Sequence, residues 1–146
     1  MTFDLIINIL SHIILFIYLT ICTITDIRTN TISRIYSICC GLILLLLNIL
    51  STNISFTDIL ISAFPGLCLL LLGIATRQAI GYGDGIGLMI LGIFEGFEGM
   101  LFIAARAFLL SSLYGIWMLL ALRKTWSASM PFFPFLLMAF AGGLIL

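Results

Sequence analysis

The sequence has very little charge. Only 8% of its 146 residues are Asp, Glu, Lys or Arg, whereas 63% are hydrophobic, and a soluble domain carries about 25% charged residues. A chain of this length could form one soluble domain, but this one lacks the polar surface to cover it. Its long apolar runs require lipid as their solvent. We therefore expect an all-α membrane protein with a single transmembrane domain over residues 1–146.

Other features are also missing, and each absence excludes a class of protein. The formal net charge is zero, so there is no basic field for nucleic acid, and we expect no nucleic-acid partner. The four cysteines form no C-x-x-C pair, which leaves out the usual spacing of zinc ligands. The N-terminus lacks the basic start and the small-residue cleavage site of a signal peptide, so residues 5–24 are interpreted as a retained helix.

Apolar runs suited to crossing a bilayer occur six times. A spanning helix needs about 20 residues, and shorter ones are tolerated. Residues 86–122 form one apolar stretch that is far too long for a single span, and the EGFEG segment at residues 95–99 is the natural place for a turn. We predict helices at residues 5–24, 35–50, 58–75, 85–100, 101–122 and 131–146.

The basic residues predict the orientation of this bundle. Five of the six lie in alternate loops, the first, third and fifth, and therefore on one side: Arg28, Arg34, Arg77, Arg123 and Lys124. The positive-inside rule makes that side cytoplasmic. We therefore predict that both termini lie outside.

Two acidic residues lie at the predicted cytoplasmic edge, Asp26 after the first helix and Asp84 before the fourth. Carboxylates at a membrane are costly and so are candidates for function. Two that lie a few ångströms apart share a proton, so that one acts as base and the other as acid. Such a pair can activate water against a peptide bond. The sequence places both at one depth and leaves open whether they meet.

The remaining ionisable residues have simpler interpretations. Asp4 and Asp58 lie at outer helix ends, where a helix dipole favours a carboxylate. Glu95 and Glu98 are expected to face the outer water or to pair with Arg106. The lone histidine, His12, is expected to be hydrogen-bonded within the bundle.

Glycines alternate around Asp84, at positions 81, 83, 85 and 87. Such a run is not expected to form a stable helix. It permits close backbone approach, and so could place the Asp84 carboxylate beside an extended substrate. The alternative is an ordinary flexible loop before a helix. A dinucleotide-binding loop is disfavoured because Ile86 stands where G-x-G-x-x-G requires glycine, and no strand precedes it.

Four segments resemble the motifs of one family, in the same order. D-x-R-x-x-x-I, here Asp26 to Ile32, resembles the first motif of prepilin peptidases. Gly81 to Asp84 resembles their G-x-G-D motif, which presenilin-type proteases share. The last two segments are residues 88–92, which resemble LLAALG, and residues 131–136, PFFPFL, which resemble PFGPFL.

The resemblance implies an aspartic endopeptidase of the bacterial cytoplasmic (inner) membrane. Such enzymes remove the basic leader from type IV prepilins or type II secretion pseudopilins at the cytoplasmic face, with no metal or cofactor in the peptidase step. Asp26 and Asp84 would then be the catalytic pair. Residues expected to support the loops or the substrate are Gly81, Gly83, Gly85, Arg28, Pro131 and Pro134.

The chain departs from the family pattern at several positions. Ser33 and Arg34 replace Pro-Asn, Ile86 replaces a common lysine, and Phe133 replaces the glycine of PFGPFL. These changes bear on substrate fit more than on chemistry. The N-terminal methyltransferase domain of larger members has no counterpart here, so we expect no S-adenosylmethionine site. Two alternatives stay open: an inactive relative or non-enzymatic membrane subunit, and a small transporter, against which the position of both aspartates at one edge argues.

Overall fold

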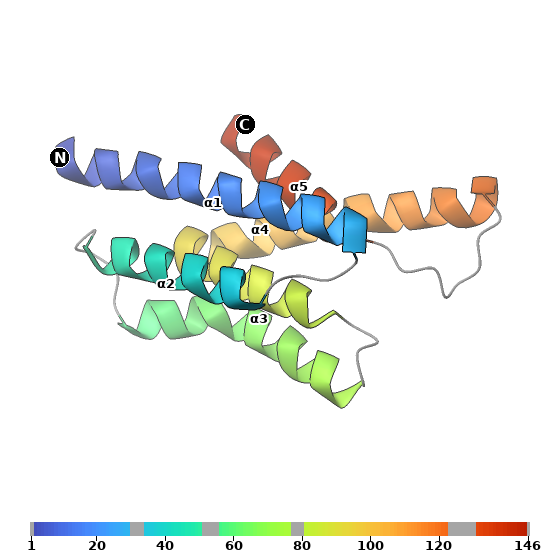
Figure 1. Cartoon of the computed structure of the whole chain (residues 1–146), viewed down its shortest axis with the longest axis horizontal. Helices are drawn as coiled ribbons and strands as arrows, with labels where there is room; N and C mark the ends of the chain where they lie inside the picture. The colour runs from blue at the N-terminus through green and yellow to red at the C-terminus, as the bar shows by residue number, and fades with distance from the viewer. Residues whose placement is uncertain (1, 30–33, 51–55, 77–80, 123–130, 146) are drawn as a thin grey trace.

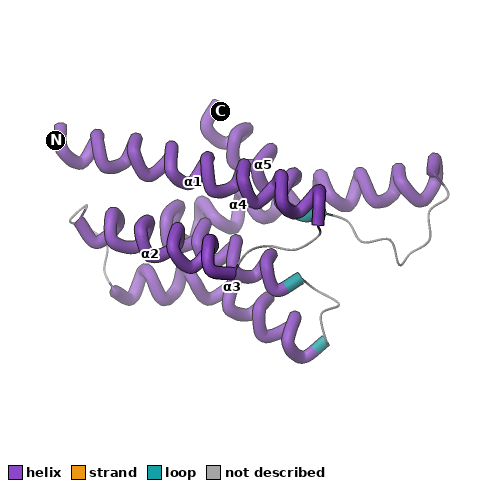
Figure 2. Tube along the Cα trace, in the orientation of Figure 1, coloured by secondary structure: helices purple, strands orange, loops and turns teal. Residues whose placement is uncertain are grey.

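The structure, a computed structural model, describes residues 2–29, 34–50, 56–76, 81–122 and 131–145. These residues are almost entirely helical, as Figure 2 shows. The helices are α1 (Thr2–Thr29), α2 (Arg34–Leu50), α3 (Phe56–Ala75), α4 (Tyr82–Leu122) and α5 (Phe133–Ile145). The predicted all-α fold is confirmed for the described part of the chain.

Several of these helices are suited to a membrane. Among the described residues, three are long and apolar enough to span a bilayer, over Leu5–Thr29, Thr57–Ala75 and Tyr82–Leu120, and α2 and α5 contain shorter apolar segments. Large apolar side chains such as Ile43, Phe64 and Leu109 are exposed on the outer surface, where lipid can cover them. Six spans with both termini outside remain a prediction.

Helix α4 contains one break, at Gly96. Its φ of 75° and ψ of 174° lie in a region that glycine populates readily and other residues rarely. In Figure 1, α4 runs in one direction before this break and returns after it. The predicted turn within residues 95–99 is therefore confirmed. The predicted boundary between residues 100 and 101 is wrong, because the chain turns at the glycine that can adopt positive φ.

The helix α1 continues past the predicted end at residue 24. The hydroxyl of Thr25 donates to the Ile21 carbonyl at 3.1 Å, and that of Thr29 donates to the Thr25 carbonyl at 2.9 Å. These bonds satisfy the polar side chains within the helix. Because α1 extends to Thr29, Asp26 lies in its last full turn instead of in a loop.

Close packing joins α3 to the first part of α4. A side chain at Gly85 would meet the Leu70 backbone nitrogen at 2.8 Å, and side chains at Gly66 and Gly92 would overlap the Met89 nitrogen and the Ser62 carbonyl oxygen. Small residues at helix interfaces permit this approach in membranes. This close packing holds the first part of α4, which includes Asp84, against α3.

Candidate active site

The end of α1 and the beginnings of α4 and α5 gather at one end of the bundle (Figure 1). Each brings one of the motifs found in the sequence: Asp26 from α1, Asp84 from α4 and Phe133 from α5.

Asp26 is buried, with 7% of its surface exposed. It lies on the inward face of α1, one helical turn after Cys22 and two turns after Leu19, which are buried as well. The backbone N–H of Phe133 donates a hydrogen bond to Asp26 Oδ2 at 3.1 Å. A buried carboxylate needs such a donor, because burial without one is costly. The first motif is thus joined to PFFPFL by a bond between a side chain and the backbone.

Asp84 lies in the first turn of α4 and is partly buried. Its backbone N–H donates to the Gly81 carbonyl at 3.1 Å, which begins the helix. The Asp84 carboxyl group interacts electrostatically with that of Asp26. The structure therefore brings together the two aspartates that the sequence placed only at the same depth.

Three of the four glycines around Asp84, at positions 83, 85 and 87, are helical, so the prediction that the run would not form a stable helix is wrong for this part. Residues 82–87 form the first turns of α4. The low helix propensity of glycine is overcome by packing: Gly85 approaches the α3 backbone, and Gly87 faces the ring of Phe133. The glycines thus provide close contacts on two sides of one helix.

The other predicted support residues differ in how exposed they are. Arg28 is exposed in the last turn of α1, and Gly81 is exposed just before α4. Gly83, Pro131 and Pro134 are half-buried, and Gly85 is buried. The expectations for Ser33, Arg77, Arg123 and Lys124, and for the side chains of Asp4 and Arg34, fall outside the described residues. Ile86, which stands at the lysine position of the family, packs against the core.

Two contributors to the site were missed by the sequence reasoning. One is the N–H of Phe133, and the other is the space at Gly87 that the Phe133 ring fills. The motif that contains Phe133 was recognised. Its N–H could not be singled out, because every residue except proline has a backbone N–H. Gly87 was seen only as a member of the glycine run.

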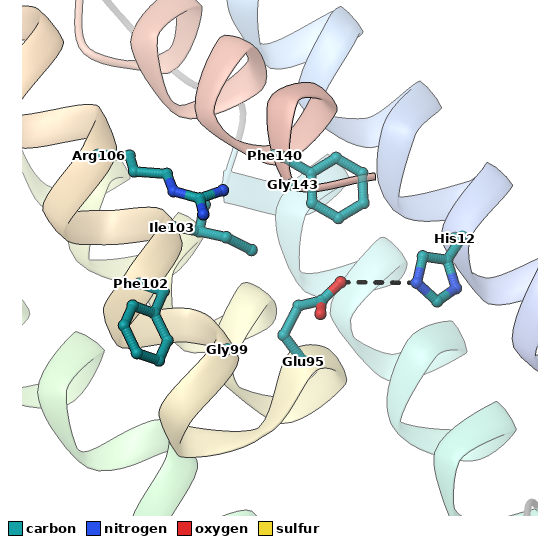
Figure 3. Close-up of a pocket in the computed structure, with 8 residues that line it drawn as sticks. All are labelled: His12, Glu95, Gly99, Phe102, Ile103, Arg106, Phe140 and Gly143. Atoms are coloured by element: carbon teal, nitrogen blue, oxygen red, sulfur yellow. Dashed lines mark ion pairs between the residues drawn. The ribbon is translucent and has the colours of Figure 1, made fainter. Parts of the chain in front are cut away.

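A second group of ionisable side chains lies farther along the bundle. Figure 3 shows His12, Glu95 and Arg106 around a cavity of about 260 Å³. His12 Nε2 and Glu95 Oε1 are 3.8 Å apart, and His12 Nδ1 lies 2.8 Å from the Asn8 carbonyl oxygen. The hydrogen-bonded histidine is thus confirmed. The ion-pair partner that the structure gives Glu95 is His12 instead of Arg106, which lines the same cavity.

A further cavity, of about 330 Å³, lies between α3 and α4 and is lined by Asp58, Glu95 and Glu98, among others. Neither of these two cavities includes Asp26 or Asp84 in its lining. In the described part of the chain, no group of three or more His, Cys, Asp or Glu side chains is arranged to hold a metal ion.

Over the described residues, fold and site together define a helical protein with helices long and apolar enough to span a membrane and with two carboxyl groups that interact. The chain matches the type IV leader peptidase family over residues 13–146, a range that includes both aspartates and all four motifs. It therefore belongs to that family, and the resemblance drawn from the sequence is confirmed. No curated protein and no solved structure matches the chain.

Proposed function

We propose that the protein is a membrane aspartic endopeptidase that removes the basic leader from type IV prepilins or type II secretion pseudopilins at the cytoplasmic membrane face. Family membership supports a peptidase with a protein substrate. The observation that carries the aspartic mechanism is that Asp26 and Asp84, which come from different helices and motifs, lie close enough to interact electrostatically.

The chemistry follows from two carboxyl groups that share one proton. The ionised carboxylate takes a proton from water, and the water oxygen attacks the carbonyl carbon of the scissile peptide. The protonated carboxyl group gives its proton to the carbonyl oxygen. The C–N bond of this intermediate then breaks, and the leaving amine takes the proton that the first carboxylate had received from water. One hydroxyl group of the intermediate returns its proton to the carboxylate that had protonated the carbonyl oxygen, so that both groups regain their starting state.

The position of the pair suits a substrate with a polar leader and an apolar helix. Asp26 lies at the end of the apolar helix α1, and Asp84 lies at the beginning of the apolar helix α4. A site at the ends of spanning helices lies near the boundary between lipid and water. There the substrate helix can stay in lipid while its leader stays in water.

The test is cleavage of a prepilin-like substrate co-expressed with the protein and followed by a gel shift. We expect the wild-type protein to remove the leader, and Asp26→Asn and Asp84→Asn each to lower the rate by roughly 1000-fold or more, as for groups that act as a unit. Asp58→Asn is the matched control, because Asp58 is an exposed aspartate at the start of α3. Full cleavage by either active-site variant would overturn the mechanism. Failure of the wild-type protein on every such substrate would favour an inactive relative.

A further inference from the structure

Phe133 contacts the surroundings of both aspartates. Its backbone N–H donates to Asp26 Oδ2 at 3.1 Å. Its side chain is fully buried, and its ring faces Gly87, which follows Asp84 by three residues, or about one turn of α4. One residue of α5 is therefore bonded to the first aspartate and packed against α4 about one turn from the second.

The contact between Phe133 and Gly87 leaves no space for a larger residue. A Cβ atom added at Gly87 would lie 2.6 Å from Cζ and 3.1 Å from Cε1 of the Phe133 ring. Since the ring is fully buried, it cannot swing into solvent to relieve such a clash. The fit therefore fixes how deeply the first turn of α5 sits against α4.

Phe133 can affect both aspartates because α5 packs against the two helices that carry them. Helix α5 packs against both α1 and α4, and these contacts are far more extensive than those between α1 and α4 themselves. Helix α5, like α2, therefore helps to set the position of α1 relative to α4, and Phe133 is its first helical residue.

The N–H of Phe133 is free to take this role because of its place in the helix. The first N–H groups of a helix have no carbonyl partner within it. The helix begins with the Phe132 carbonyl, which accepts from the N–H groups of Phe135 and Leu136 at 3.1 and 3.2 Å. The Phe133 N–H points instead to the carboxylate, and a hydrogen bond to a charged acceptor is stronger than a neutral one.

We propose that Phe133 is a positioning residue that sets the Asp26 carboxylate relative to Asp84, with its N–H holding Asp26 and its ring held by the space at Gly87. The proposal rests on the proposed function, since positioning matters for the reaction of the pair. It adds a role for Phe133 and for Gly87, neither of which touches the reacting peptide in this scheme.

The first test compares Phe133→Pro with Phe133→Ala. Both lose the phenyl ring, but only proline replaces the N–H that faces Asp26 by a carbon atom, Cδ, and the helix itself accepts proline at its first position. We expect kcat for leader cleavage to be about tenfold lower in Phe133→Pro than in Phe133→Ala, because the bond to a charged group is lost. KM should differ by less than about twofold, since substrate binding is unchanged. Equal kcat values in the two variants would overturn the role of the N–H.

The second test examines the ring. Gly87→Ala should lower kcat, and adding Phe133→Leu should restore much of it, because leucine lacks the ring atoms Cζ and Cε1 that the new methyl group would meet. Gly142→Ala is the matched control, since a Cβ there meets nothing within 4 Å, and it should leave kcat unchanged. Loss of activity in Gly87→Ala without rescue would overturn the role of the fit.

A measurement without substrate separates this proposal from the proposed function. The chain has four aspartates, so protein labelled with ¹³C at the aspartate carboxyl carbons and placed in lipid nanodiscs gives four resonances, with that of Asp26 assigned by Asp26→Asn. We expect the Asp26 resonance to move in Phe133→Pro relative to Phe133→Ala. An unmoved resonance would overturn the positioning role even if the protein cleaves leaders. A moved resonance would support it even if no prepilin-like substrate were cleaved, in which case only the proposed function fails.

Discussion

Two regions of the bundle contain ionisable side chains, and they differ in the signs of their charges. At one end, Asp26 and Asp84 are both acidic and interact with each other. Farther along the same helices, His12 and Glu95 form an ion pair, and Arg106 lines their cavity (Figure 3). Glu95 and Asp84 both belong to α4. Eleven positions separate them in the sequence, which corresponds to about 16 Å along a helix.

The difference in sign suggests different roles. Basic and acidic groups in one cavity compensate each other, so the second cluster is explained by structure alone. Two neighbouring carboxylates in an apolar bundle do not compensate each other. The backbone donors described for the pair, from Phe133 and Phe132, both favour Asp26 only. An uncompensated pair of this kind is better explained by chemistry than by stability.

The largest expected effect on stability comes from Gly92, which lies on α4 between the two clusters. A side chain there would overlap the Ser62 carbonyl oxygen on α3. We expect Gly92→Ala to lower the free energy of unfolding by about 1–3 kcal/mol through overpacking, measured by denaturation in detergent, and to lower cleavage as well. Unchanged stability would show that the packing of α3 against α4 at Gly92 is looser than the structure indicates.

A smaller effect is expected from the mixed-charge cluster. Glu95→Gln removes the charge that faces His12 at 3.8 Å, and both side chains are partly exposed, so we expect a loss of about 1 kcal/mol or less. Cleavage should be unchanged, because the cluster is remote from the aspartates. Glu98→Gln, on the exposed side of the same turn, is the control for the change in net charge. A large loss of cleavage in Glu95→Gln alone would mean that this cluster also takes part in the reaction.

The smallest effect is expected for a single carboxylate outside both clusters. Asp58 is exposed in the first turn of α3, where a negative charge interacts favourably with the helix dipole. Asp58→Asn should cost about 0.3–1 kcal/mol at low salt, less at high salt, and should leave cleavage unchanged. Thermal unfolding at two salt concentrations measures this. A salt-independent loss would place the stabilisation in hydrogen bonding and not in charge.

The sequence was sufficient for the features that depend on residue identity and order. The four motifs predicted the family, and the positions of Asp26 and Asp84 at helix ends predicted that both lie at one depth. The turn within residues 95–99 followed from glycines in an otherwise unbroken apolar run. Each of these signals is local or depends on simple periodicity.

The features that the sequence did not reveal depend on packing between distant segments. The glycines around Asp84 are unfavourable for a helix by propensity, yet α4 begins there, because Gly85 and Gly87 permit contacts with Leu70 and Phe133. Phe133 was noted only as a departure from the family motif, and its bond to Asp26 spans 107 positions of the chain. Propensity describes neighbours in sequence and cannot include such partners.

Cleavage and thermal unfolding measured on one preparation of Asp84→Asn distinguish a catalytic role of the aspartate pair from a stabilising one. We expect leader cleavage to be lost while the unfolding temperature is unchanged or higher, because asparagine cannot carry a negative charge beside Asp26 and keeps the backbone bond to Gly81. An unfolding temperature as low as that of Gly92→Ala, or cleavage at the wild-type rate, would contradict the catalytic role.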